Sequence, residues 1–281
     1  MDPAEAKNII ITNIKAIPTL PDKMHQVLTL LKDDNTSVKE LAHFISSDQA
    51  MASKILQAAN SIRYGFSRKI ATVDRATVIL GFKAVTSLVL GISVFDNFRL
   101  TKNETTIDLD ELWKHSMGCA VAAQIISDKS GGGVDRKTVL TAAILHDIGK
   151  VIMDLFFSRE YAKTLNTVRN NGLSMAKAEE NVMGFNHADA GGWFCDELAF
   201  PSVLVSPISF HHNVDGVDKE HEIVTSIVHI ADNLCKRAQI GDGGDYNKIH
   251  AINLHAQRLL NLNKDDLEKI TGELKEEENV N

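Results

Sequence analysis

The stretch "ILHDIGKVI", residues 144–152, places an imidazole, a carboxylate and an ammonium group inside an aliphatic run. A buried polar or charged group costs free energy unless it is hydrogen-bonded, paired with an opposite charge or bound to a metal ion. A fold that buries this run must therefore supply partners for His146, Asp147 and Lys150. Adjacent side chains on a helix diverge by about 100°. His146 and Asp147 therefore either flank an ion lying against one helix or lie where the helix breaks.

Helical patterns surround this stretch on both sides. Period-2 alternation is scarce, and the chain has only five prolines and three tyrosines, so we expect an all-α fold. Residues 101–110, "TKNETTIDLD", are polar and aperiodic, which indicates a linker. We expect an N-terminal helical subdomain over residues 1–105 and a second helical subdomain over residues 106–281 that ends in an acidic helix or tail.

Apolar spacing also predicts individual helices. In the first half, "SDQAMASKILQAANS" places Ala52, Ile55, Leu56 and Ala59 on an inward face. In the second half, a helix from about Leu109 to Asp128 ends before the glycines at 131–133, and another begins near Asp135 and carries the motif at its C-terminal end. Further helices are expected over 153–170, 174–183, 187–198, 201–210, 220–238, 247–261 and 264–276, with the final "ELKEEENVN" frayed.

Charge and cysteine usage exclude several classes of protein. The 37 acidic residues outnumber the 30 Lys and Arg residues, giving a net charge of −7, which argues against a nucleic-acid surface. Cys119, Cys195 and Cys235 are isolated and odd in number, so we interpret them as reduced, buried thiols of a cytoplasmic protein. The acidic start "MDPAEAKNII" lacks the layout of a signal peptide.

One segment has the composition of a membrane span. Residues 76–95, "ATVILGFKAVTSLVLGISVF", are strongly apolar, but Gly81 and Lys83 interrupt them. Two short buried helices are therefore expected in place of a span, and no membrane partner is expected.

Further side chains in the second half suit a buried metal site. They are imidazoles and carboxylates near helix ends or on apolar helix faces: Glu111, His115, His187, His211, His212 and Asp232. Mixed donors of this kind suit iron, manganese, nickel or zinc. We expect one or two divalent transition-metal ions, with iron or manganese favoured. Such an ion would lower the pKa of a bound water molecule, and Lys150, on the same helical side as His146 and Asp147, could neutralise a phosphate.

The histidines also admit structural interpretations. His187 can be the first residue of a helix that Asn186 caps. Either His211 or His212 can be a ligand while the other faces solvent. His229, one turn before Asp232, can orient a ligand from behind.

The charged residues admit similar alternatives. Asp232 can bond to a helix N-terminus or to a core histidine. Glu111, in a first helical turn, can complement the helix dipole. Lys150 can be a solvated cation at a helix end. The glycine-rich "IGDGGDYNK", residues 240–248, has the composition of a calcium loop but lacks its terminal Glu, so no site is expected there.

Taken together, the motifs resemble a known superfamily. "LHDIGK", with "LWKHS" upstream and "GFNHADAGGWF", "ISFHHN" and "VHIADN" downstream, looks like the HD superfamily of metal-dependent phosphohydrolases. Residues 17–85, from "IPTLPDKMHQVL" to "GFKAV", are similar to the HDOD domain of bacterial signalling proteins. The resemblance covers roughly residues 15–235. It implies an HD-like helical bundle preceded by a helical subdomain, in the bacterial cytoplasm.

The resemblance also implies a ligand set. It places HD-type ligands at His115, His146, Asp147, His187, His211, His212 and Asp232. Glu111 matches an acid that some HD-GYP phosphodiesterases use for an additional metal. "HHNVDGVDKE", however, begins like the HD-GYP loop and contains no Gly-Tyr-Pro, so hydrolysis of cyclic-di-GMP is not expected.

Two functions follow from these observations. The first is a regulatory HDOD protein that retains the metal site and acts through signalling partners or a bound nucleotide or phosphate. The second is a metal-dependent phosphohydrolase or phosphodiesterase acting on a nucleotide, in which Asp147 and Lys150 would be catalytic. The sequence leaves the oligomeric state open.

Overall fold

The computed structural model describes residues 1–15, 38–46, 49–61, 70–82, 85–86, 88–89, 91–93, 105–131, 134–245 and 251–278. Every regular element within these ranges is a helix, and the all-α prediction is confirmed.

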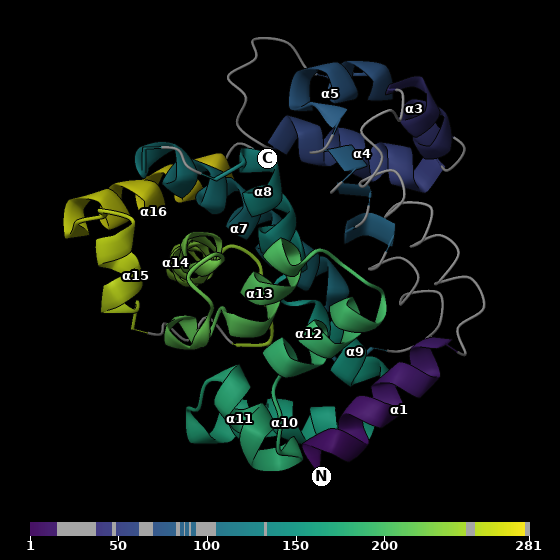
Figure 1. Ribbon diagram of the computed structural model, residues 1–281, viewed down its shortest axis with the longest axis vertical. Coiled ribbons are helices and arrows are strands. Elements are labelled where there is room, and N and C mark those ends of the chain that lie inside the picture. Colours follow the sequence, from purple (N-terminus) through teal and green to yellow (C-terminus); the bar gives the residue numbers. More distant parts are fainter. Residues whose placement is uncertain are drawn as a thin grey trace.

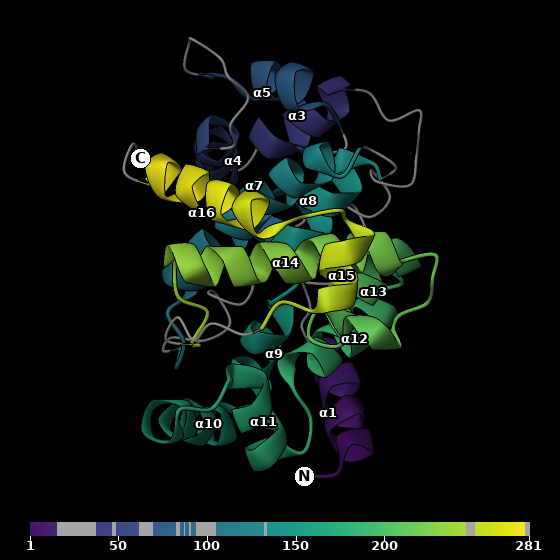
Figure 2. The same ribbon diagram turned by 90° about the vertical axis from the view of Figure 1, so that its left-hand side faces the viewer.

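The helices are distributed along the long axis of the molecule (Figures 1 and 2). One end holds α3 (Val38–Ser46), α4 (Gln49–Ser61) and α5 (Val73–Leu80), which pack against one another. The opposite end holds α1 (Pro3–Lys15), α10 (Ser158–Asn171) and α11 (Met175–Met183). Of the four residues of α4 predicted to face inward, Ile55 and Ala59 are buried, and Ala52 and Leu56 are partly buried against the same core.

The centre is built around α14, which Figure 2 shows lying across the molecule. It packs against α7, α8 and α13 on its inner side and against α15 and α16 on its outer side. The bounds of the remaining helices are α7 (Leu109–Lys129), α8 (Arg136–Leu145), α9 (Ile148–Phe156), α12 (His187–Glu197), α13 (Ser202–Phe210), η1 (Val214–Gly216), α14 (Glu222–Ala238), α15 (Leu254–Leu259) and α16 (Lys264–Glu278).

The long helix α7 has clear start and stop signals. The Asp108 side chain accepts hydrogen bonds from the backbone N–H groups of Asp110 and Glu111, which lack intrahelical partners. After Lys129 the chain turns through Gly131 at φ +86°, a conformation that favours glycine. Both ends agree with the sequence prediction.

The opening motif lies at a break between two helices. α8 ends at Leu145, α9 begins at Ile148, and Asp147 between them has φ −96° and ψ 10°. His146 and Asp147 are therefore not on one helical turn. The break lets both side chains turn into the same interior region, and Lys150 follows in the first turn of α9.

The N-terminal helix α1 packs against α12 and α9. Its inward positions Ala6, Ile10 and Ile14 are buried. The sequence indicated no partner for this helix. The division of the chain at residue 105 stays a prediction.

The prediction of a single continuous helix over residues 153–170 is wrong. The structure has α9 and α10 there, separated by Phe157 at φ −132° and ψ 40°. The buried Phe157 ring packs edge-on against Phe185, with ring centroids 5.7 Å apart. Packing of this aromatic side chain fixes the corner, which a count of apolar spacing does not predict.

The C-terminal region differs from prediction in two places. Of the helix expected over 247–261, residues 251–253 are not helical, and α15 begins only after Asn253, whose side chain caps it. α16 continues to Glu278, so the fraying expected from residue 273 onward is wrong up to that residue. Burial of Leu274 stabilises this last part of the helix.

Among the described residues, no helix combines the length and apolarity needed to cross a bilayer. Within the apolar segment 76–95, α5 ends at Leu80 and Gly81 follows at φ +85°. The predicted interruption at Gly81 is confirmed.

Helices α9 and α12 approach each other so closely that a side chain at Gly149 has no room. A Cβ there would overlap the carbonyl oxygen of His187 and lie 2.7 Å from the nitrogen of Gly191. We predict that Gly149→Ala lowers the free energy of unfolding by about 1–3 kcal/mol or more, because backbone cannot give way as a flexible side chain does. Urea unfolding followed by circular dichroism measures the change.

Gly272→Ala is the matched control, because nothing lies within 4 Å of a Cβ at Gly272 in the helix α16. It should stabilise the protein by roughly 0.5–1 kcal/mol through helix propensity alone. Equal effects of the two substitutions would contradict the close packing of α9 on α12.

Candidate metal centre

Seven of the predicted ligands meet in one cluster in the interior of the second half. They come from α7, the α8–α9 junction, the start of α12, the end of α13 and α14. All are buried except His212, which is partly buried: His115, His146, Asp147, His187, His211, His212 and Asp232.

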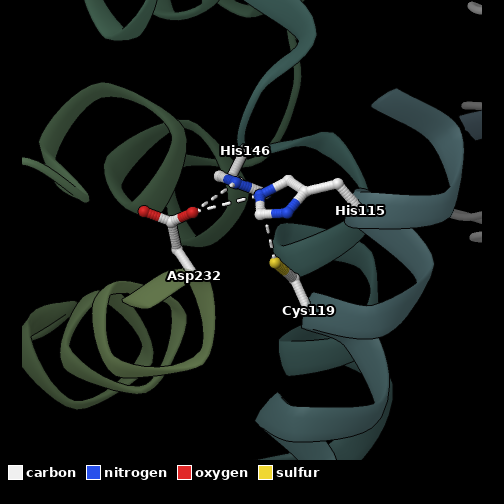
Figure 3. Close-up of side chains that lie close together, drawn as sticks. All are labelled: His115, Cys119, His146 and Asp232. Carbon is white, nitrogen blue, oxygen red and sulfur yellow. Dashed lines mark hydrogen bonds and ion pairs between the residues drawn. The ribbon is translucent and has the colours of Figure 1, made fainter. Parts of the chain in front are cut away.

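The first part of the cluster lies between α7 and α14 (Figure 3). His115 Nε2 lies 3.1 Å and His146 Nε2 3.7 Å from the same oxygen, Oδ1 of Asp232. Cys119, one turn after His115, brings its Sγ to 3.4 Å from His115 Nε2. These imidazole, carboxylate and thiol donors converge closely enough to hold a transition-metal ion.

Cys119 was expected only as a buried, reduced thiol. It is free and buried, as are Cys195 and Cys235. Its place beside the cluster was missed, although its spacing of four residues from His115 puts both on one helix face.

The second part of the cluster is formed by three imidazoles. His187 and His212 approach each other through their Nε2 atoms at 2.8 Å, and the ring centroids of His211 and His212 are 4.0 Å apart. Burial and the neighbouring imidazoles lower the pKa of His211 and of His212 well below the usual value. Both rings are therefore neutral near pH 7, the form in which histidine binds metals. Both members of the His211–His212 pair belong to the cluster.

Asp147 lies between the two parts and faces both. Its Oδ2 is 3.7 Å from His115 Nε2 and 3.4 Å from His146 Nε2. Its Oδ1 is 3.2 Å from His187 Nε2 and 3.8 Å from His211 Nε2. One carboxylate thus presents one oxygen to each part, as a ligand shared between two ions would.

Two imidazoles are oriented so that one ring nitrogen of each faces the cluster. His146 Nδ1 donates to the Ala143 carbonyl at 2.7 Å, and His211 Nδ1 donates to the Ile208 carbonyl at 2.9 Å. Each ring therefore directs its Nε2 into the cluster. Both Nε2 atoms are buried and lack a hydrogen-bond partner within the described parts of the chain. A metal ion would satisfy these atoms, so the residues present fit the group that the motifs imply.

His187 is the first residue of a capped helix, as one interpretation of the sequence predicts, and it also lies in the cluster. Asn186 and Asp189 form a capping box at the start of α12, with His187 as its first residue. The His187 Nδ1 lies 2.6 Å from Glu179 Oε2 of α11, which also accepts from the His187 backbone N–H. Burial alone would lower the pKa of His187, but Glu179 outweighs it and that pKa rises to about 9. Glu179 thereby fixes the ring with Nε2 toward Asp147.

His229 supports the cluster from behind. Its Nδ1 donates to the His211 carbonyl at 2.7 Å, and its Nε2 accepts from the Asn253 backbone N–H at 2.9 Å. His229 therefore positions the backbone of His211 and not the Asp232 side chain that follows it by one turn.

Glu111 is partly exposed and belongs to none of the metal-binding groups that the described residues form. It lies in the first turn of α7, where an acidic side chain complements the helix dipole.

Two buried lysines complete the surroundings of the cluster. Lys150 Nζ donates to Asp147 Oδ2 at 2.8 Å and Lys236 Nζ donates to Asp232 Oδ2 at 2.9 Å. Both ammonium groups also bond to Asp245. Lys150 is completely buried, so its interpretation as a solvated cation is wrong.

Sequence reasoning missed Lys236, Asp245 and Glu179. Lys236 had a local signal, because it follows Asp232 by four residues on one helix face. Asp245 and Glu179 had none, since their partners Lys150 and His187 are defined only by the tertiary fold.

The carboxylates of the cluster are ionised. Burial would raise the pKa of Asp147, but His146 and Lys150 outweigh it and hold that pKa well below the usual range. Burial likewise opposes ionisation of Asp232, and Lys236 and His115 overcome it. Conversely, burial would lower the pKa of His146, while Asp147 raises it to about 10. Protons therefore occupy part of the cluster near neutral pH.

The comparisons with known proteins agree with this fold. The sequence model of the HDOD domain matches residues 17–214. A solved structure of an HDOD domain protein with unknown function from Geobacter sulfurreducens superimposes with a TM-score of 0.76 at 22% identity, covering 97% of this chain and 95% of that one. A candidate phosphohydrolase from Shewanella amazonensis gives a TM-score of 0.70 at 19% identity, covering 95% and 93%.

Two further relatives are larger than this chain. A candidate signal transduction protein from Marinobacter aquaeolei gives a TM-score of 0.72 at 16% identity, covering 92% of this chain and 57% of that one. An uncharacterized protein of Treponema pallidum is 19% identical over 222 residues, which are 79% of this chain. The match spans only 42% of the length of that curated relative. At these identities the structural similarities show the fold.

The protonation of the cluster predicts how metal uptake depends on pH. His146 and His187, with pKa values of about 10 and about 9, carry protons at pH 7 that a metal ion must displace. Binding of Mn²⁺ to metal-free protein should therefore release protons, and its apparent affinity should rise with pH up to this range. Calorimetry in buffers of different ionisation enthalpy measures the release.

Glu179→Gln is the informative variant, because it removes the anion that raises the pKa of His187. It should release fewer protons than the parent chain at the same pH. Heats that do not depend on the buffer would contradict binding at these imidazoles.

Proposed function

The chain belongs to the HDOD domain family, and we propose that it is a bacterial regulatory protein of signal transduction whose buried cluster holds one or two divalent transition-metal ions. The observation that supports metal binding most directly is the pair of buried Nε2 atoms of His146 and His211, each without a hydrogen-bond partner among the described residues. The fold it shares with a candidate signal transduction protein agrees with the regulatory role.

The proposed ligands divide between two ions. His115, His146 and Asp232 would hold one ion, and His187, His211 and His212 the other. Asp147 would contribute one oxygen to each. Iron or manganese suits this mixture of imidazole and carboxylate best, with nickel or zinc as alternatives. A divalent ion held there would supply Lewis acidity and lower the pKa of a bound water.

The charge pattern favours regulation over turnover. Within the part of the chain that the structure describes, Lys150 and Lys236 are the cations beside the cluster, and both already pair with the chain's own carboxylates. The absence of Gly-Tyr-Pro after His212 separates the chain from enzymes that hydrolyse cyclic-di-GMP. We therefore propose that metal or phosphate occupancy is communicated to signalling partners.

A metal-dependent phosphohydrolase is the second candidate. It is favoured by the complete set of seven ligand side chains. Lys150, 2.8 Å from Asp147 Oδ2, would then neutralise the phosphate while Asp147 helps to hold the ions. The candidate phosphohydrolase from Shewanella amazonensis shares the fold.

Metal content tests the proposal directly. Protein purified without chelators should contain one to two transition-metal ions per chain by mass spectrometry. Asp147→Asn should lose most of the metal, because it weakens both parts at once, whereas His146→Ala and His211→Ala should each lose the ion of one part.

His255→Ala is the control, since His255 is an exposed histidine that pairs with Glu222 on the surface. Its metal content should equal that of the parent chain, and circular dichroism should show that every variant is folded. Less than one ion per chain in the parent protein would refute the metal site.

Turnover separates the two candidate functions. We expect Mn²⁺-loaded protein to show no hydrolysis of nucleotides or of a chromogenic phosphodiester above that of its His146→Ala variant. Hydrolysis that disappears in both His146→Ala and Lys150→Met would establish the phosphohydrolase instead.

A further inference from the structure

Two buried ammonium groups beside the metal centre have a geometry that metal binding alone does not explain. The exposed fraction of the residue is 0% for Lys150 and 3% for Lys236. A buried ammonium group is unfavourable without an anionic partner. Each has one in the cluster, Asp147 for Lys150 and Asp232 for Lys236.

Both lysines also converge on a third carboxylate. Asp245 Oδ2 accepts a hydrogen bond from Lys150 Nζ at 3.1 Å and forms an ion pair with Lys236 Nζ at 3.0 Å. Its other oxygen, Oδ1, accepts from the backbone N–H of Met175 at 3.1 Å. Burial would raise the pKa of Asp245, but the two lysines overcome this and keep it ionised.

The segment that carries Asp245 lies directly on the cluster. It follows α14 and contains Gly241 and Gly244, with φ +61° and +85°. A Cβ at Gly243 would lie 2.8 Å from Lys150 Nζ and 3.2 Å from Asp147 Oδ2. A side chain at residue 243 would have to displace these groups, whereas glycine lets the segment lie this close and brings the Asp245 carboxylate between the two lysines.

Metal binding would change the balance of charge at this position. In the cluster, Asp147, Asp232 and Asp245 face two ammonium groups. Ions bound by Asp147 and Asp232 would withdraw negative charge from Lys150 and Lys236. Asp245 would then be the main anion between the two lysines. Two ammonium groups that converge on one oxygen are the arrangement that binds phosphoryl oxygens in charge-assisted hydrogen bonds.

We propose that Lys150 and Lys236 form a binding site for the phosphoryl group of a small ligand, and that Asp245 occupies this site as an internal competitor. A phosphoryl group carries more charge and more acceptor oxygens than the carboxylate that it displaces, and it can contact both lysines at once. The proposal deepens the proposed function and rests on it for the role of the ions. The lysine pair itself is formed by the chain alone.

Binding of inorganic phosphate tests the proposal. Asp245→Asn removes the competing charge and keeps an oxygen that can accept from Met175. Calorimetry with Mn²⁺-loaded protein should show phosphate binding at least about tenfold tighter for Asp245→Asn than for the parent chain. Adding Lys236→Met to Asp245→Asn should abolish the gain.

Asp154→Asn is the matched control. Asp154 is another buried aspartate whose Oδ2 accepts backbone N–H groups, from Thr106 at 2.8 Å and Ile107 at 3.4 Å, outside the lysine pair. It should leave phosphate binding unchanged. A gain in Asp154→Asn equal to that in Asp245→Asn would overturn the proposal, because it would show a general effect of removing a buried charge.

Phosphate binding no tighter in Asp245→Asn than in the parent chain would also overturn it and leave Asp245 as a structural bridge. If Asp245→Asn does not fold, Asp245→Ser, which leaves space where the carboxylate lay, is measured in the same way.

The metal-free forms of the same proteins are also titrated with phosphate, which separates this proposal from the proposed metal site. Phosphate binding by metal-free Asp245→Asn in a chain that takes up no Mn²⁺ would refute the metal site and support the anion site. Normal Mn²⁺ uptake without tighter phosphate binding in Asp245→Asn would support the metal site and refute the anion site.

Discussion

The carboxylate of Asp147 is the constraint on which the rest of the second half depends. It is buried and ionised, and both of its oxygens face imidazoles while Oδ2 also accepts from Lys150. A buried carboxylate without such partners would cost several kcal/mol. The α8–α9 break, the capped start of α12 and the position of α14 all serve to bring these partners to one place. The packing of these helices therefore determines whether the buried charge of Asp147 is compensated.

Close backbone packing makes this arrangement possible. Gly149 on α9 lies against His187 and Gly191 on α12 with no space for a side chain. Because Gly149 follows Asp147 by two residues, the same contact that joins the helices brings His187 Nε2 within 3.2 Å of Asp147. Glu179 then fixes the ring from α11. The glycines of the motif are thus as important to the site as its charged residues.

Local signals predicted most of the helices and most of the side chains that meet in the cluster. The ends of α7 follow from Asp108 and Gly131, and polar side chains in apolar runs identified His146 and Asp232. What could not be predicted depends on tertiary contacts. The corner at Phe157 comes from packing on a ring distant in sequence, and Asp245 pairs with Lys150 across 95 residues. From its composition, the segment around Asp245 was not expected to contain a site.

The proposed metal ions and the proposed anion site would be coupled by the carboxylates that they share. Asp147 and Asp232 each present oxygen to the imidazole cluster and to a lysine. An ion that binds these carboxylates weakens their hold on Lys150 and Lys236 and so strengthens the attraction of those lysines for an anion. By reciprocity, an anion that takes up the lysines leaves the carboxylates freer to bind metal. A centre with this linkage responds to metal and phosphate together, which is the behaviour of a sensor and requires no turnover.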